Sequence, residues 1–228
     1  MDIIFAMDIR SGVVVKGYKG DREQYEPIER HSKICTTSDP LNVINAIKPR
    51  RTYVADLDRI LGSGSNSLII KRLSARTKTL IDIGIRRFDD VQEAERIGDI
   101  AIIGTETGQL DVIRAAQSMR VDVSIDIKEG RAISSDPALS GDPLQIIEKM
   151  NLYKISELLV LNMNLVGTKH GVDFEFIEQA IDVSGHPIVV AGGVKNTEEL
   201  DMLEDLGAAG AILSTAIHEE IIPVDLVR

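Results

Sequence analysis

One stretch of sequence occurs twice, once near the start and once near the middle of this 228-residue chain. Each copy is an apolar run that ends in aspartate, Asp8 or Asp126, followed by an aliphatic residue, a basic residue, a spacer and glycine. The two aspartates lie about half a chain length apart. The repeat predicts two similar halves, each placing one carboxylate at the carboxyl end of a buried strand.

A second repeated sequence pattern supports this duplication. Two apolar runs are each followed by a glycine and a basic residue, then an acidic helical segment and another glycine, at matched spacing: Gly84 and Gly98, Gly193 and Gly207. Each unit then closes with an apolar run that leads to threonine, Thr105 or Thr215. One such likeness is common between βα units, but two likenesses in register favour a twofold internal repeat.

Eight short apolar runs alternate with segments that have helical spacing or helix-start signals. The runs are Ile3–Met7, Thr52–Ala55, Thr79–Ile83, Ile100–Ile103, Val121–Ile125, Leu158–Leu161, Pro187–Val190 and Gly210–Leu213. They are apolar throughout, as in strands covered on both faces. We therefore predict a single (β/α)8 TIM barrel domain over residues 1–228, in preference to an open doubly wound sheet, whose glycine-rich first turn is missing here.

Composition narrows the class of protein. The chain has 36 acidic and 26 basic residues, which disfavours a nucleic-acid partner. It has no apolar run long enough for a membrane span and no secretory signal, and its one cysteine, Cys35, cannot form an intrachain disulfide. These features predict a cytoplasmic protein, while the sequence does not fix an oligomeric state.

The barrel prediction brings Asp8 and Asp126 to opposite sides of one site, because active sites of these barrels form at the carboxyl ends of the strands. Two opposed carboxyl groups suit general acid and base catalysis, one abstracting a proton and the other, with a pKa raised by burial, donating one. The structural alternative is that each aspartate caps its turn or pairs with Arg10 or Lys128.

Glycines and hydroxyl residues after the last two strands resemble the phosphate site of many barrels, where backbone N–H groups bind the anion. The predicted phosphate-binding residues there are Gly192, Gly193, Ser214 and Thr215. The corresponding residues of the first half are Gly84, Gly104 and Thr105. In that half, Asp82 and Ile83 occupy places where glycine would ease backbone approach, and a carboxylate beside an anion site weakens binding.

No metal or other cofactor is predicted. Asp56 and Asp58 could hold Mg²⁺, but no third ligand is evident, and we favour a structural role around the loop Gly62–Asn66. The four histidines show no metal-ligand spacing.

Several motifs resemble those of the histidine-biosynthesis aldose–ketose isomerase family and its cyclase relative. They are Ala6-Met-Asp8-Ile-Arg-Ser-Gly12, Val54-Ala-Asp56-Leu-Asp58, Gly84-Ile-Arg86, Ser124-Ile-Asp126, Gly167-Thr168 and Ala191-Gly-Gly-Val194. The resemblance implies a barrel that performs an Amadori rearrangement of a phosphorylated aminosugar without a metal. It implies that Asp8 is the base, that Asp126 is the acid, that Thr168 helps to hold the substrate, and that Arg86 belongs to the binding site.

The sequence also departs from the family pattern. Asp82-Ile83 stands where members usually have glycines, Val166 stands where they usually have aspartate, and the chain has no Trp to stack on the substrate. The hypotheses are therefore the pathway isomerase, or a divergent paralogue with a smaller or singly phosphorylated substrate. Two further alternatives are a sugar-phosphate lyase or condensing enzyme, and a non-catalytic binder of a phosphorylated ligand.

Overall fold

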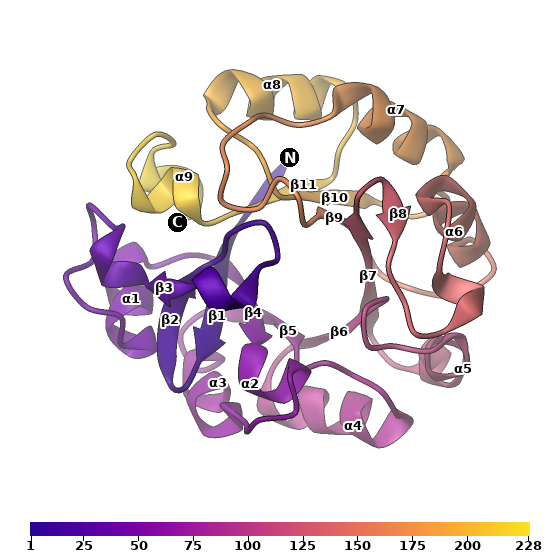
Figure 1. Cartoon of the computed structure of the whole chain (residues 1–228), viewed down its shortest axis with the longest axis horizontal. Helices are drawn as coiled ribbons and strands as arrows, with labels where there is room; N and C mark the ends of the chain where they lie inside the picture. Colours follow the sequence, from indigo (N-terminus) through magenta and orange to yellow (C-terminus); the bar gives the residue numbers. More distant parts are fainter.

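A closed ring of eight parallel strands forms the centre of the computed structural model, which describes residues 1–228 (Figure 1). Each strand pairs with the next along the ring, and the last pairs back onto the first, Asp2 opposite Gly210 through Phe5 opposite Leu213. The ring contains β1 (Asp2–Arg10), β4 (Arg51–Asp56), β5 (Lys78–Asp82), β6 (Ile100–Gly104), β7 (Val121–Lys128), β9 (Leu158–Asn162), β10 (Ile188–Ala191) and β11 (Gly210–Leu213). The predicted (β/α)8 TIM barrel is confirmed.

Helices surround the ring of strands (Figure 1). They are α1 (Pro40–Ile47), α2 (Leu57–Ile60), α3 (Ser67–Leu73), α4 (Phe88–Ile97), α5 (Leu110–Ala115), α6 (Pro143–Met150), α7 (Phe174–Val183), α8 (Thr197–Asp205) and α9 (Thr215–His218). Short 3-10 turns occur at Arg22–Gln24, Ile28–Arg30, Ala116–Ser118, Pro137–Leu139 and Val224–Leu226. The Asp-Pro signals begin α1 and α6 as predicted, with the carboxylates of Asp39 and Asp142 accepting backbone hydrogen bonds. None of the helices has both the length and the apolar character needed to cross a bilayer.

Alternation along each strand divides the apolar side chains into two layers. Phe5 and Val54 belong to a large cluster with helix residues such as Val91, so they face the helices. Their neighbours Ile4 and Tyr53 belong to a smaller cluster inside the barrel. The strands are thus covered on both faces, which is why their sequences read as unbroken apolar runs.

The two copies of the repeated stretch form the same local structure. β1 and β7 continue beyond the barrel into antiparallel hairpins, β1 with β2 (Val13–Lys16) and β7 with β8 (Arg131–Ala132). Each hairpin turns through two residues with positive φ, Ser11-Gly12 and Glu129-Gly130. These turns favour glycine at the second position. β2 also pairs with the short strand β3 (Glu26–Pro27). Duplication of the half-barrel stays a prediction that these hairpins support.

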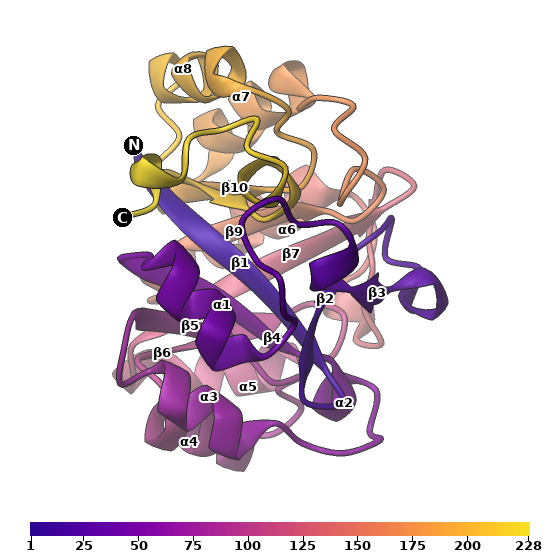
Figure 2. The ribbon, with the colours of Figure 1, turned by 90° about the vertical axis from the view of Figure 1, so that its left-hand side faces the viewer.

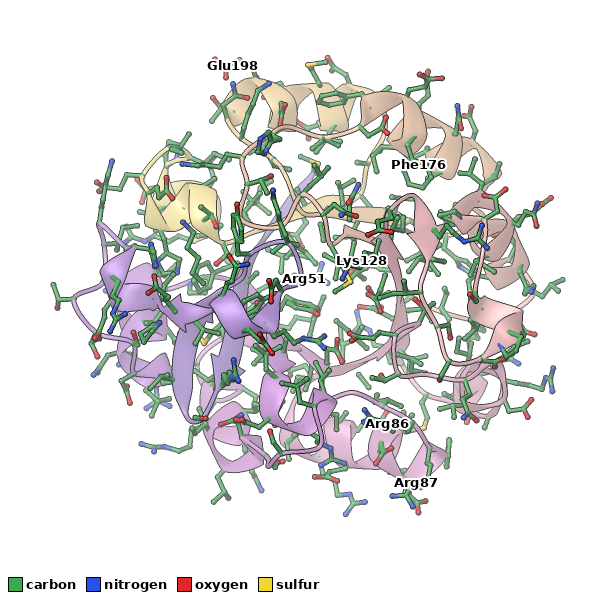
Figure 3. The ribbon with its side chains drawn as sticks, viewed as in Figure 1. Arg51, Arg86, Arg87, Lys128, Phe176 and Glu198 are labelled. Carbon is green, nitrogen blue, oxygen red and sulfur yellow. The ribbon has the colours of Figure 1, made fainter.

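Ion pairs close the end of the barrel at which the strands begin. Arg51 opens β4 and lies near the centre of the ring (Figure 3), where it binds the carboxylates of Asp2 at 2.5 Å and Glu157 at 2.6 Å. β1 crosses the molecule obliquely from this end to the paired strands β2 and β3 at the opposite end (Figure 2). The opposite end, where the strands finish, therefore holds the loops that form the cavity described next.

Candidate active site

A cavity of about 1140 Å³, including the part open to solvent, lies at the carboxyl ends of the strands. Among the predicted site residues, those that line it are Asp8, Asp126, Gly192, Gly193, Ser214 and Thr215. They come from β1, β7 and the loops after β10 and β11. Residues distant in the sequence thus share one wall, as the barrel prediction requires.

Asp8 is held by backbone pairing on both sides, while its carboxylate stays free. In the sheet it lies opposite Val15 of β2 and Ala55 of β4. Its side chain forms no hydrogen bond within the chain and faces the cavity. Burial raises the pKa of Asp8 to about 6, although Arg22 lowers it and Asp82 adds a smaller increase.

Asp126 is buried and fixed by three hydrogen bonds. Its carboxylate accepts from the Ser124 hydroxyl at 2.7 Å and the Glu106 backbone N–H at 2.9 Å. Its own N–H donates to the Thr105 hydroxyl at 2.9 Å. Burial, followed by the nearby charge of Asp82, raises the pKa of Asp126 to about 7.

Asp82 adds a third carboxylate to the cavity wall. It accepts hydrogen bonds from the Tyr53 hydroxyl at 3.2 Å and the Gly84 N–H at 2.9 Å. Burial raises its pKa to about 6. The sequence predicted only that Asp82 would weaken a phosphate site. Its position as the last residue of β5 was the signal that it would join Asp8 and Asp126.

An ion pair that the sequence did not reveal lies in the cavity wall. Arg22, in the first 3-10 turn, binds the carboxylate of Glu106 with both terminal nitrogens, at 2.8 and 2.6 Å. Both residues line the cavity. The Arg22 carbonyl accepts a hydrogen bond from Arg10 of β1. No local pattern marks this pair, because it depends on the path of the long loop after β2.

The loops after β10 and β11 present unused hydrogen-bond donors. The backbone N–H groups of Gly192, Gly193, Ser214, Thr215 and Ala216 have no acceptor within the chain, and these residues line the cavity. The two glycines have φ of 92° and 94°, and a Cβ there would lie 2.6 and 2.7 Å from carbonyl oxygens. Only glycine fits at either position. Such a group of N–H donors suits an anion.

The corresponding residues of the first half lie outside the cavity wall. The N–H of Gly84 donates to Asp82, that of Thr105 donates to the Ser124 carbonyl, and a Cβ on Gly104 would lie 2.9 Å from the Asp126 carboxylate. Arg86 is exposed on the helix side of the ring near α4 (Figure 3). Its guanidinium donates to the carbonyls of Gly84 and Ile60.

Thr168 lies in the loop between β9 and α7, next to the cavity residues Gly167 and Lys169. Its hydroxyl donates to the Leu165 carbonyl at 2.8 Å, so it shapes the loop and does not line the cavity. Lys169 lines the cavity, and its ammonium pairs with Glu219.

Asp56 and Asp58 have the structural role that we favoured. Asp56 accepts from the Asn66 backbone and side chain at 2.7 Å, and Asp58 accepts from Asn66 and from the Ser11 N–H. The two carboxylates tie the loop after α2 to the β1–β2 turn. No three His, Cys, Asp or Glu side chains converge as metal ligands in the structure.

Comparison with known proteins gives one family over nearly the whole chain. Residues 2–223 match the family model described as histidine biosynthesis protein. An uncharacterized protein of Methanocaldococcus jannaschii is 33% identical over 99% of this chain and 96% of its own length.

Two other relatives carry the name of an enzyme. They are named isomerases of an imidazole-4-carboxamide that bears a phosphoribosyl group and a phosphoribosylamino group. The relative from Methanosphaera stadtmanae is 26% identical over 99% of this chain and 97% of its own. The relative from Methanocaldococcus jannaschii is 23% identical over 97% of this chain and 95% of its own. That organism therefore has both the more similar uncharacterized protein and a named isomerase.

Proposed function

Because the chain belongs to the histidine biosynthesis protein family, we propose that it is an aldose–ketose isomerase that rearranges a phosphorylated aminosugar. One observation carries the proposal: Asp8 and Asp126 line one cavity whose wall also presents free backbone N–H groups for a phosphate. We also propose that residues 1–228 act as one domain, because the site needs strands from both halves of the chain.

The proposed reaction needs one base and one acid. When the ring oxygen of a glycosylamine is protonated, the C1–O bond breaks and the nitrogen lone pair forms a C=N bond with C1, which gives an iminium ion. Removal of the proton from C2 gives an enaminol, and a proton then adds to C1 while the C2 hydroxyl loses its own. C2 is thereby oxidised to a ketone and C1 is reduced, so no external oxidant is needed.

Differences between the two carboxyl groups support the assignment of roles. Asp8, whose pKa is about 6, is mostly ionised at neutral pH and accepts the C2 proton. Asp126, whose pKa is about 7, keeps a proton on a large fraction of molecules and donates it to the ring oxygen. The neighbouring charges agree with these roles, since the leading one for Asp8 is Arg22, which favours its ionised form, and the leading one for Asp126 is Asp82, which disfavours its ionised form.

The phosphate of the substrate is proposed to bind Gly192, Gly193, Ser214 and Thr215 through their backbone N–H groups. Thr168 is proposed to hold the loop that carries Lys169 against the substrate. The remaining predicted residues lie outside the cavity wall, and we propose that they position the residues that line it. They are Gly84, Arg86, Gly104 and Thr105. Thr105 and Gly104 fix the place of Asp126, and Arg86 braces the turn after β5.

A lyase or condensing enzyme that uses a Schiff-base lysine is less well supported. Lys169 is the one lysine in the cavity wall, and its ammonium is engaged by Glu219. A binder without activity would use the same anion site but would need neither carboxyl group. Turnover that depends on Asp8 separates both alternatives from the isomerase.

The test is an isomerase assay with the glycosylamine formed from ribose 5-phosphate and aniline, run in D2O and followed by NMR. The assay is repeated with the doubly phosphorylated ribotide named for the relatives. We expect a 1-anilino-1-deoxyketose product carrying deuterium at C1. Asp8→Asn and Asp126→Asn should each lower kcat by about 100-fold or more while the protein stays folded.

Asp122→Asn is the matched control, because Asp122 lies on the same strand as Asp126 but outside the cavity wall. It should keep the activity of the wild type. Full activity in Asp8→Asn, or no product from either compound with wild-type protein, would reject the proposed function.

A further inference from the structure

The two ends of the cavity use their backbone N–H groups differently. At the end formed by the loops that follow β10 and β11, five backbone N–H groups have no acceptor within the chain. At the end formed after β5 and β6, Gly84 donates its N–H to Asp82, and Glu106 donates its N–H to Asp126. The first end is open to an anion, whereas at the second end carboxylates of the protein already accept the Gly84 and Glu106 N–H groups.

Charge reinforces this difference. Asp82, Asp126 and Glu106 all line the second end. The one arginine in the cavity wall, Arg22, is bound by both oxygens of Glu106. A phosphate placed there would meet carboxylates and a cation that is already neutralised, and like charges at such short range repel strongly when water is displaced.

We infer that the substrate carries a single phosphate, bound by the loops after β10 and β11, and that its other end, facing Asp82, is uncharged or cationic. This inference rests on the proposed function and names the substrate class. The named isomerases act on a compound with two phosphoribosyl groups. Methanocaldococcus jannaschii has a named isomerase and also an uncharacterized relative that is more similar to this chain. This agrees with a separate substrate for the uncharacterized relative.

The experiment compares two stable probes of the same chemistry. Reductive coupling of ribose 5-phosphate to one or to both amino groups of 1,4-diaminobenzene gives a singly and a doubly phosphorylated anilino-deoxyribitol. Calorimetry measures the affinity of each probe for the wild type, Asp82→Asn and Glu106→Gln. Asp89→Asn is the matched control, because it removes the same charge from an exposed position on α4.

The wild type should bind the singly phosphorylated probe at least roughly tenfold more tightly than the doubly phosphorylated one. Asp82→Asn should reduce this preference by removing the opposing charge. Glu106→Gln should reduce it as well, because Arg22 becomes available to the second phosphate. Asp89→Asn should leave the preference unchanged.

Equal or tighter binding of the doubly phosphorylated probe by the wild type would overturn the inference, as would a preference that both cavity variants retain. Both results leave the isomerase proposal intact if Asp8-dependent turnover occurs. Conversely, a clear preference for one phosphate without turnover of the aniline glycosylamine would support the site assignment and reject the isomerase.

Discussion

Three carboxyl groups in one cavity have pKa values close to neutrality. Burial is the main cause for Asp8, Asp82 and Asp126 alike. Because their charges also act on one another, the protons are shared among the group, and a titration reports the group as a whole. Among the neighbouring charges, Arg22 favours the ionised form of Asp8, whereas Asp82 disfavours the ionised form of both Asp8 and Asp126.

The pH dependence of activity should reflect this group. The base must be ionised and the acid protonated, so kcat/KM should rise through about pH 6 and fall above about pH 7. In Asp82→Asn the loss of a neighbouring negative charge lowers the pKa of Asp126, so the descending limb should move to lower pH. A pH profile of kcat/KM for wild type, Asp82→Asn and Asp89→Asn measures this. A descending limb in the same place in all three proteins would contradict the coupling.

At the scale of elements, two loops meet over the cavity. The loop after β2 approaches the loop after β9, where the Lys19 N–H donates to the Val166 carbonyl at 2.9 Å. Gly167 has φ of 73°, and a Cβ there would lie 2.1 Å from the Gly17 carbonyl oxygen. Contact this close requires glycine, so the cover of the cavity depends on one residue without a side chain.

Gly167→Ala should therefore separate the two loops and weaken substrate binding. We expect KM to rise by roughly tenfold, with a stability loss of about 1–3 kcal/mol from strain and lost contact. Gly62→Ala is the control, because Gly62 has a similar φ of 71° but no atom near its Cβ position. If both variants raise KM equally, backbone strain alone explains the effect and the loop contact does not matter.

The eight barrel strands and most of the helices were predictable because burial on both faces and capping residues leave local patterns. Asp39-Pro40 and Asp142-Pro143 begin helices through contacts within a few residues. The Arg22–Glu106 pair was not predictable, since it joins two loops whose paths depend on the closed barrel. Asp82 was visible in the sequence, but its approach to Asp126 follows from the order of strands around the ring.

At the scale of the whole molecule, the barrel carries buried charge at both ends. Opposite the cavity, Asp122 is fully buried, and one of its carboxylate oxygens has no hydrogen-bond partner. Burial, with the charge of Glu157, raises its pKa to about 7. An acid whose pKa is raised in the folded state favours folding below its unfolded pKa, near 3.8, and that contribution is lost as the pH rises through about 7.

Asp122→Asn should consequently make the protein more stable at pH 8 than the wild type, by on the order of 2 kcal/mol, with a smaller gain at pH 5. The amide keeps an oxygen for the Glu157 N–H, which Asp122 now binds at 3.0 Å. Urea unfolding at the two pH values provides the measurement, with Asp89→Asn as the exposed control. A gain that is equal at both pH values would show that titration of Asp122 is not the cause.

The place of two tyrosines in the cavity wall has a consequence for the fluorescence of the protein. The chain has four tyrosines and no tryptophan, and Tyr25 and Tyr53 both belong to the cavity wall. Half of the residues that give the protein its ultraviolet fluorescence therefore lie where a ligand would bind. The intrinsic tyrosine fluorescence can therefore report on this site without a label. A tryptophan introduced elsewhere would be the only tryptophan that fluoresces in the protein.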